Sequence, residues 1–288
     1  MNITQALKNS YSLLIDKSKT YKLDCEILLA FTLKKKDRLD LFLNTDQKLN
    51  ELEKELFLNY VDQRKKNKPI AKIINQRSFW KFDFNLSRKV LIPRPETEVL
   101  ISLVTNCITE NKNLRFLDIG CGSGCISISL LDYFKKSKGI AIDISKEAVL
   151  STKFNLNKFN LSNRLKVLKR DVFKFKTNDK FDLIISNPPY LKLSEYSCLD
   201  PSIKIFEPYE AFISDNKDGL KFYEKIIFYF KRNIKLNGYL AFEIGDNQIK
   251  KIEKLLYLNG FAVVSKFKLI NNQVRCILAK KIKNYALQ

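Results

Sequence analysis

The 288-residue sequence contains no histidine. This absence excludes every site that depends on an imidazole, including Ser-His-Asp triads, Cys-His nucleophile pairs, histidine general bases and histidine-ligated zinc. No Cys-x-x-Cys pair is present either, which argues against a structural zinc site. The six cysteines stand at positions 25, 107, 121, 125, 198 and 276. We expect free thiols, typical of a protein in the reducing cytoplasm.

Long apolar runs are also missing. No stretch approaches the roughly 18 consecutive apolar residues of a membrane span. The first 17 residues lack the basic start and apolar segment of a secretory signal. The composition, 45% hydrophobic and 29% charged, is that of an ordinary globular protein. We expect no membrane partner, and a chain long enough to bury one large core or two.

Acidic residues are few relative to basic ones, 31 against 52, which gives a net charge of +21. Such an excess indicates a nucleic-acid partner. However, lysine outnumbers arginine 42 to 10, whereas the bidentate, fork-like recognition of phosphates and base edges favours arginine. The charge is also spread along the whole chain. We interpret much of it as compositional bias and expect no stable nucleic-acid complex. The remaining charge is available for docking onto an RNA-rich assembly.

The first 68 residues contain neither glycine nor proline. Apolar residues recur there at three- and four-residue spacing, which predicts helices, and Asp24 and Asn50 are candidate helix starts. We expect an all-α bundle over residues 1–75 and assign it to binding the body of a substrate. Apolar and polar residues then alternate, which predicts a hairpin or extended linker over residues 76–92.

From residue 114 onward the pattern changes to short apolar segments separated by helix-like stretches. The expected strands are 114–120, 139–144, 164–172, 181–189, 238–245, 261–269 and 274–281. The expected helices between them are 126–136, 146–159, 220–233 and 247–259. This alternation predicts an α/β fold with an open, mostly parallel sheet, in which the last strands form an antiparallel hairpin.

Three of only eight glycines fall within five residues, at Gly120, Gly122 and Gly124, between the first expected strand and helix. A glycine-rich turn at this place lets backbone amides approach a ligand closely. The spacing differs from the Gly-x-Gly-x-x-Gly of dinucleotide-binding folds. No Gly-Lys-Ser/Thr follows, which excludes a phosphate-binding P-loop. A tight turn without a ligand is the alternative.

Carboxylates stand at the ends of three successive expected strands, where doubly wound sheets bind ligands. They are Asp118, Asp143 and Asp171. Each could be a helix or turn cap by itself, but three of them after a glycine loop favour a ligand site. Asp143 comes 19 residues after Gly124, and a carboxylate there can accept both hydroxyls of a ribose.

The glycine loop, followed by an acidic residue at the end of the next strand, resembles the S-adenosylmethionine-dependent methyltransferases of the Rossmann-like class I fold. The resemblance implies that residues 93–288 form the methyltransferase domain and that no metal is needed. It implies that the methionine portion of the cofactor is held by the loop, the ribose by Asp143, and the adenine by the turn at Asp171 and Val172. The predicted cofactor-binding residues are Asp118, Gly120, Cys121, Gly122, Ser123, Gly124, Asp143, Asp171, Val172 and Asn187.

The fourth expected strand ends in Asn187, Pro188, Pro189 and Tyr190. Two prolines cannot continue a central strand, so the simplest interpretation is a rigid turn. The Asn187 side-chain oxygen and the Pro188 carbonyl can each accept one N–H of a planar NH₂ group, which orients its nitrogen towards a methyl donor. Tyr190 offers a flat aromatic face. We predict Asn187, Pro188 and Tyr190 to be catalytic and all four residues to bind substrate.

This Asn-Pro-Pro-Tyr sequence resembles the motif of methyltransferases that act on the planar amino groups of adenine, guanine or glutamine. Residues 92–98, Ile-Pro-Arg-Pro-Glu-Thr-Glu, are expected to form an extended, proline-locked segment that caps a helix. Together the two motifs resemble the protein-glutamine methyltransferases that modify peptide-chain release factors, and this resemblance covers nearly the whole chain. It implies methylation of the glutamine in the Gly-Gly-Gln motif of class I release factors, with Arg94 and Glu96 binding substrate.

The sequence departs from that family's pattern at several positions. Lys72 and Asn75 stand where the family usually has tyrosine and glycine, Val172 replaces a larger apolar residue, and Cys121 stands where threonine is common. Arg275 lacks its usual Gly-Asp/Glu-Arg context. Two alternatives are weighed: an adenine or guanine amino-methyltransferase acting on DNA or ribosomal RNA, and a non-catalytic RNA-binding or ribosome-assembly factor. The segment 92–98 argues against the first, and the complete Asn-Pro-Pro-Tyr motif against the second.

Overall fold

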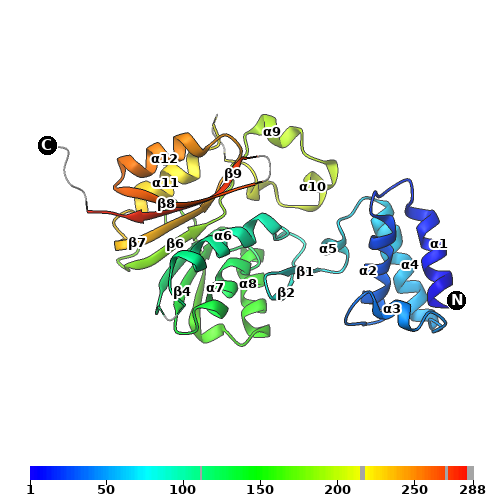
Figure 1. Cartoon of the computed structure of the whole chain (residues 1–288). Coiled ribbons are helices and arrows are strands. Elements are labelled where there is room, and N and C mark those ends of the chain that lie inside the picture. The colour runs from blue at the N-terminus through cyan, green and yellow to red at the C-terminus, as the bar shows by residue number, and fades with distance from the viewer. Residues whose placement is uncertain (111, 215–217, 270–271, 284–288) are drawn as a thin grey trace. The chain divides into compact units, whose positions relative to one another are not determined.

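The computed structural model describes residues 1–110, 112–214, 218–269 and 272–283 (Figure 1). The contacts divide the chain into two compact units. The first unit comprises Met1–Gln76 and Pro201–Phe206, and the second comprises Arg77–Asp200 and Glu207–Gln288.

The first unit is helical. Its helices are α1 (Ile3–Leu14), α2 (Tyr21–Thr32), α3 (Asp40–Leu43), α4 (Glu51–Lys65), α5 (Ile70–Ile73) and, from far along the chain, α10 (Pro201–Phe206). Buried Leu28, Leu29 and Phe57 lie in the core cluster of this unit. The predicted helical N-terminal region is confirmed. Its role in substrate binding remains a prediction.

One of the two predicted helix starts is confirmed and the other is wrong. Asn50 caps α4 with a reciprocal capping box. Asp24 instead lies inside the first turn of α2 and is buried. Its Oδ2 accepts hydrogen bonds from Ser18 Oγ at 2.6 Å and Arg64 Nε at 2.7 Å. The carboxylate therefore joins α2 to α4 through an ion pair, which a cap exposed at a helix start could not do.

The second unit begins at Arg77, within a two-stranded sheet of β1 (Gln76–Phe79) and β2 (Phe82–Asn85). Only residues 80 and 81 connect the strands, and Trp80 has a φ of 57°, in the left-handed region that few side chains adopt. Phe79 and Phe84 are both buried in the core of the main sheet. This hairpin therefore packs as part of the second unit.

The main sheet has seven strands in the order β5-β4-β3-β6-β7-β9-β8. They are β3 (Arg115–Ile119), β4 (Lys138–Asp143), β5 (Leu165–Lys169), β6 (Phe181–Ser186), β7 (Ile234–Glu243), β8 (Phe261–Lys268) and β9 (Val274–Lys281). The first five in this order pair in parallel, and β9 is antiparallel to both of its neighbours. The predicted α/β class, with a mostly parallel sheet and an antiparallel C-terminal strand, is confirmed.

Helices cover both faces of this sheet (Figure 1). On one face lie α6 (Pro95–Cys107), α7 (Cys125–Tyr133) and α8 (Lys146–Lys158), whose buried side chains share a core cluster with Phe116. On the other face lie α11 (Lys221–Phe230) and α12 (Ile249–Leu258), which share a second cluster with Leu117. Because successive strand residues point to opposite faces, the nearly continuous apolar sequence of β3 supplies both cores.

Candidate active site

The glycine loop follows β3 at the carboxyl edge of the sheet, and all three of its glycines are left-handed. Their φ angles are 78° at Gly120, 56° at Gly122 and 85° at Gly124. A Cβ added to either of the first two would meet no atom closer than 4.0 Å, whereas at Gly124 it would lie 2.9 Å from Thr152 Cγ2. Gly120 and Gly122 therefore border open space that a ligand can use, and Gly124 allows α7 to pack against α8.

Asp143, the last residue of β4, holds the glycine loop in place. Its Oδ2 accepts a hydrogen bond from the Gly122 N–H at 3.0 Å, and its Oδ1 accepts one from the Ser145 N–H at 2.9 Å. Burial raises the pKa of this carboxyl, and the two backbone hydrogen bonds oppose the rise. Each carboxylate oxygen has a second lone pair, so Asp143 can still accept a hydroxyl donor.

Asp118 lies in β3 and is fully buried. Its Oδ2 accepts a hydrogen bond from Ser127 Oγ at 2.6 Å, and its Oδ1 has no hydrogen-bond partner among the described residues. Removal from water raises the pKa of this carboxyl to about 7, while the bond from Ser127 opposes the rise and the charge of Asp143 adds to it. A buried acceptor without a partner is costly, so the site fits a ligand that brings a donor to this oxygen.

The two residues predicted to flank the adenine lie beyond β5. Asp171 closes a local turn, in which its Oδ1 accepts a hydrogen bond from the Phe173 N–H at 2.9 Å. Val172 packs against the second core cluster. Both residues are half-buried. The six cysteines are all free thiols, as predicted, and Cys121 is buried in the glycine loop.

The Asn-Pro-Pro-Tyr motif follows β6, the strand beside β3, and so lies next to the glycine loop. A Cβ on Gly120 would stand 4.0 Å from the Asn187 carbonyl oxygen. The Asn187 side chain donates from Nδ2 to Thr97 Oγ1 at 3.1 Å, and Thr97 Oγ1 donates to Glu243 Oε2 at 2.6 Å. The sequence segments around residues 97, 187 and 243 thus meet in one hydrogen-bonded chain.

This chain of hydrogen bonds fixes which way the Asn187 amide faces. A hydroxyl has one proton, and Thr97 gives its proton to the carboxylate of Glu243. The Thr97 oxygen can therefore only accept from Asn187, so the NH₂ end of the amide faces inward. No described residue hydrogen-bonds to Asn187 Oδ1, which leaves this oxygen as an acceptor.

Glu243, the last residue of β7, is the final acceptor in this series of hydrogen bonds. It is 2% exposed. Burial raises the pKa of its carboxyl, while the Thr97 hydrogen bond and the Arg275 charge oppose the rise. Its Oε1 accepts a longer bond from the Tyr190 hydroxyl at 3.4 Å, and the Arg275 guanidinium carbon lies 5.8 Å from the centre of the Tyr190 ring. Burial also raises the pKa of the Tyr190 phenol, and the negative charge of Glu243 adds to this rise.

The proline-locked segment, residues 92–98, is held in place by the buried carboxylate of Glu207. Glu207 accepts a hydrogen bond from the Ile92 N–H at 2.9 Å and forms an ion pair with Arg94. Pro95 is the first residue of α6, where its missing N–H costs nothing. Glu96 contributes its backbone carbonyl, which lies 3.8 Å from Cys276 Sγ. Arg94 is thus held in place beside the motifs.

Sequence reasoning missed three residues that build this site: Thr97, Glu207 and Glu243. Glu243 ends a buried strand, as Asp143 does, so the pattern of carboxylates at strand ends could have found it. Thr97 lies inside the segment 92–98, for which the sequence predicts only an extended stretch that caps a helix. Glu207 carries no such signal. In the described part of the chain, no cluster of three potential ligands could hold a metal ion. None of the helices described is long and apolar enough to cross a membrane.

Comparisons with known proteins find similarities along nearly the whole chain. A family model for the PrmC N-terminal domain matches residues 5–74, and one for the methyltransferase small domain matches residues 96–200. A release factor glutamine methyltransferase of Clostridium acetobutylicum is 34% identical over 282 residues, which cover 97% of this chain and 98% of that protein. One of Clostridium botulinum is 37% identical over 264 residues, covering 91% and 93%.

Solved structures share the fold at lower identity. A methyltransferase from Pyrococcus furiosus aligns with a TM-score of 0.53 and 19% identity, over 78% of this chain and 99% of that one. The ribosomal protein L11 methylase of Lactobacillus delbrueckii subsp. bulgaricus aligns with a TM-score of 0.50 and 18% identity, over 68% and 82%. These similarities bear on the fold alone.

Proposed function

The chain belongs to the release factor glutamine methyltransferase family, and from this premise we propose that it methylates the side-chain amide nitrogen of a glutamine in a peptide-chain release factor. The family predicted from the sequence is thereby confirmed. The observation that best supports the reaction is the orientation of Asn187, whose side-chain oxygen is held outward by Thr97 and Glu243. By resemblance, the target is the glutamine of the Gly-Gly-Gln motif in class I release factors.

An amide nitrogen is a poor nucleophile because its lone pair is conjugated with the carbonyl group, so catalysis depends on position. We assign Asn187 Oδ1 and the Pro188 carbonyl to accept the two N–H groups of the target amide. Two acceptors fix the plane and direction of the NH₂ group, and this kind of orientation supplies a large part of the rate enhancement. The Tyr190 ring lies against the planar amide, and Arg94 and Glu96 bind the substrate segment that carries it.

S-adenosylmethionine is the cofactor that this family and the glycine loop imply, and when bound it supplies an electrophilic methyl group. The open space at Gly120 and Gly122 fits the close approach of a ligand to the backbone. Asp143 would hold the ribose hydroxyls, and Asp171 with Val172 would flank the adenine. The unpartnered Asp118 Oδ1 suits the donor end of the methionine portion. Cys121 and Ser123, which also lie in the glycine loop, are the other residues that we assign to cofactor binding there.

Replacing Asp143 with alanine is expected to weaken cofactor binding at least tenfold, since each lost charge-assisted hydrogen bond is worth about 1.5–3 kcal/mol. The melting temperature should also fall, because the N–H groups of Gly122 and Ser145 lose their acceptor. Calorimetry with S-adenosylmethionine and thermal unfolding without it separate the two effects. A lower melting temperature with unchanged affinity would leave Asp143 only its structural role.

Replacing Thr97 with valine is expected to lower kcat by about 10- to 100-fold, because the Asn187 amide loses the bond that orients it, worth about 1–3 kcal/mol. Valine keeps the shape of threonine. The matched control is Thr97→Ser, which keeps the hydroxyl and should retain most activity. Cofactor affinity should stay nearly constant in both variants. Equal activity of the valine and serine variants would show that this hydroxyl does not position Asn187.

We assign the helical region, residues 1–75, to binding the body of the release factor. These residues carry no glycine loop and no Asn-Pro-Pro-Tyr motif, so they offer nothing to the methyl group. Deleting them should raise the KM for the release factor far more than the dissociation constant for S-adenosylmethionine. Steady-state kinetics and calorimetry give the two values. Equal efficiency of the truncated and intact proteins on full-length release factor would contradict this role.

The function is tested by incubating the protein with methyl-labelled S-adenosylmethionine and either a purified class I release factor or total nucleic acid. We expect label in the release factor only, and mass spectrometry should place it on the glutamine. A release factor with that glutamine changed to alanine is the control and should remain unlabelled. Label found only in nucleic acid would overturn the proposal in favour of a base amino-methyltransferase.

A further inference from the structure

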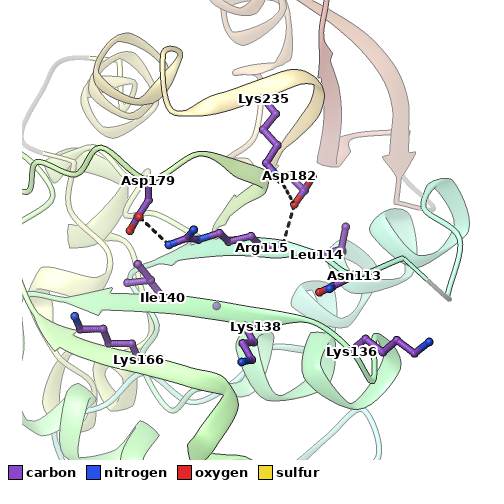
Figure 2. Close-up of a pocket in the computed structure, with 11 residues that line it drawn as sticks. Asn113, Leu114, Arg115, Lys136, Lys138, Ile140, Lys166, Asp179, Asp182 and Lys235 are labelled. Atoms are coloured by element: carbon purple, nitrogen blue, oxygen red, sulfur yellow. Dashed lines mark hydrogen bonds and ion pairs between the residues drawn. The ribbon is translucent and has the colours of Figure 1, made fainter.

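A hollow lies at the opposite, amino edge of the sheet, away from the glycine loop and the Asn-Pro-Pro-Tyr motif. It encloses about 730 Å³. Figure 2 shows it between the beginnings of the strands, with charged side chains along both sides. The lining residues are Asn113, Leu114, Arg115, Lys136, Lys138, Gly139, Ile140, Lys166, Asp179, Asp182 and Lys235. We call this hollow the amino-edge groove.

One crossover of the fold, which contributes Asp179 to the groove, has no helix. The connections from β3 to β4 and from β4 to β5 contain α7 and α8, but residues 170–180, between β5 and β6, form neither helix nor strand. Two side chains of this connection, Val172 and Phe175, pack against the second core cluster. The connection thus crosses the α11/α12 face of the sheet as an irregular segment, which covers less of that face than a helix does.

The register of the strands places three cations side by side on the α11/α12 face of the sheet. Arg115 pairs with Lys138 across β3 and β4, and Ile140 pairs with Lys166 across β4 and β5. Residues in register share a face of a sheet, and so do residues two apart in one strand. Ile140 packs against the second core cluster, so Arg115, Lys138 and Lys166 all lie on that face.

The charges in the groove do not balance. Its lining contains five cationic side chains and two carboxylates. Both carboxylates are already engaged, Asp179 with Arg115 at 2.7 Å and Asp182 with Lys235 at 2.9 Å. The other three cations are Lys136, Lys138 and Lys166, all exposed. None of these three forms an ion pair with any residue that the structure describes.

We propose that the amino-edge groove binds the phosphate backbone of a nucleic acid without reading its sequence. Three unneutralised lysines along a groove form an electrostatic surface of the kind that releases counterions from a polyanion. Lysine supplies a point charge rather than a planar fork, which suits contact with phosphates and not with base edges. The groove lining contains no aromatic side chain, so it offers no platform on which bases could stack.

The same observations argue against an acidic peptide as the occupant. β3, β4 and β6 are hydrogen-bonded to a neighbour on both sides, and β5, at the edge of the sheet, contributes only Lys166 to the groove, so most of the groove offers no free strand edge to an extended peptide. The groove contributes few apolar side chains to anchor one. A ligand held by charge alone must carry a high charge density, and duplex nucleic acid carries about one negative charge per 1.7 Å.

The test measures binding of the full-length protein to a fluorescent RNA duplex of about 20 base pairs, by anisotropy, over a range of salt concentrations. The groove variant is Lys136→Gln with Lys138→Gln and Lys166→Gln. The matched control changes three exposed lysines on α8 and α12 in the same way: Lys153, Lys250 and Lys254. Both variants lose the same net charge. Polyglutamate serves as the competing acidic polymer.

We expect the groove variant to bind the duplex at least about tenfold more weakly than the unmodified protein does. The slope of log K against the logarithm of the salt concentration should be less steep by about three, one for each lost phosphate contact. The control variant should stay close to the unmodified protein. Equal losses in both variants would overturn the proposal, because net charge alone would then explain the binding. Displacement of the duplex by polyglutamate at an equal charge concentration would also overturn it, in favour of an acidic-protein surface. Methylation of release factor by the groove variant should be unchanged, so this test is independent of the catalytic site.

Discussion

Turnover of release factor should fall by roughly three to four orders of magnitude when Asn187 is replaced with alanine. One part of this loss is the hydrogen bond to the target amide, worth about 1–3 kcal/mol when its donor is left unpaired in a dry site. The other part is orientation, since a displacement of about an ångström can cost on the order of a hundredfold. Single-turnover kinetics with saturating release factor and cofactor measure the chemical step directly.

Asn187→Gln is the matched variant for this prediction. It keeps the amide but moves the oxygen by one methylene group, so it should not restore activity. Cofactor affinity should change less than turnover in both variants, because the glycine loop and Asp143 are unaltered. If the alanine variant methylates release factor within about tenfold of the unmodified enzyme, then Asn187 does not position the nitrogen, and the motif is only a rigid turn.

The second large effect is expected at the glycine loop, where Gly122→Val should abolish measurable binding of S-adenosylmethionine. A Cβ at this position would project into the open space that borders the loop, and two methyl groups on it would fill the space that a ligand needs. The backbone φ of 56° adds strain on the order of 1–2 kcal/mol for a residue with a side chain. Most of the fold's stability should therefore remain. Calorimetry gives the affinity, and thermal unfolding gives the stability.

Gly124→Val provides the contrast for this experiment. A Cβ there would lie 2.9 Å from Thr152 Cγ2, so its main effect should be a lower melting temperature from disturbed packing between α7 and α8. The two glycines belong to the same motif, yet their expected phenotypes are opposite. Unchanged cofactor affinity in the Gly122 variant would refute the assignment of this loop to the cofactor.

The alternation of apolar strands and helices was sufficient to predict the fold class, because the central strands of a parallel sheet are buried on both faces and carry a nearly continuous apolar signature. The same logic placed the glycine loop and Asp143 at one edge, since the carboxyl ends of parallel strands meet there. These predictions rest on patterns within single helices and strands, whose residues are neighbours in the sequence.

What sequence reasoning could not supply was which motifs touch. Thr97 was interpreted as part of a helix start, and it does lie in the first turn of α6, but its hydroxyl serves Glu243 and Asn187 instead. At Asp24 the error runs the other way. An acidic residue near a helix start suggests a cap, but Asp24 is a buried residue that accepts a hydrogen bond from Arg64. Both outcomes depend on partners at least 40 positions away, which no local pattern encodes.

The hydrogen-bonded chain through Thr97 also has a consequence for the order in which the enzyme assembles. Its two bonds join residues 90 and 146 positions apart, whereas the bond that steadies the glycine loop spans only 21. Closing a loop between distant residues costs more entropy than closing one between near residues. We therefore expect the cofactor loop to form before the nitrogen-positioning amide. Partial unfolding of the same molecule should accordingly abolish methyl transfer while the glycine loop is still intact.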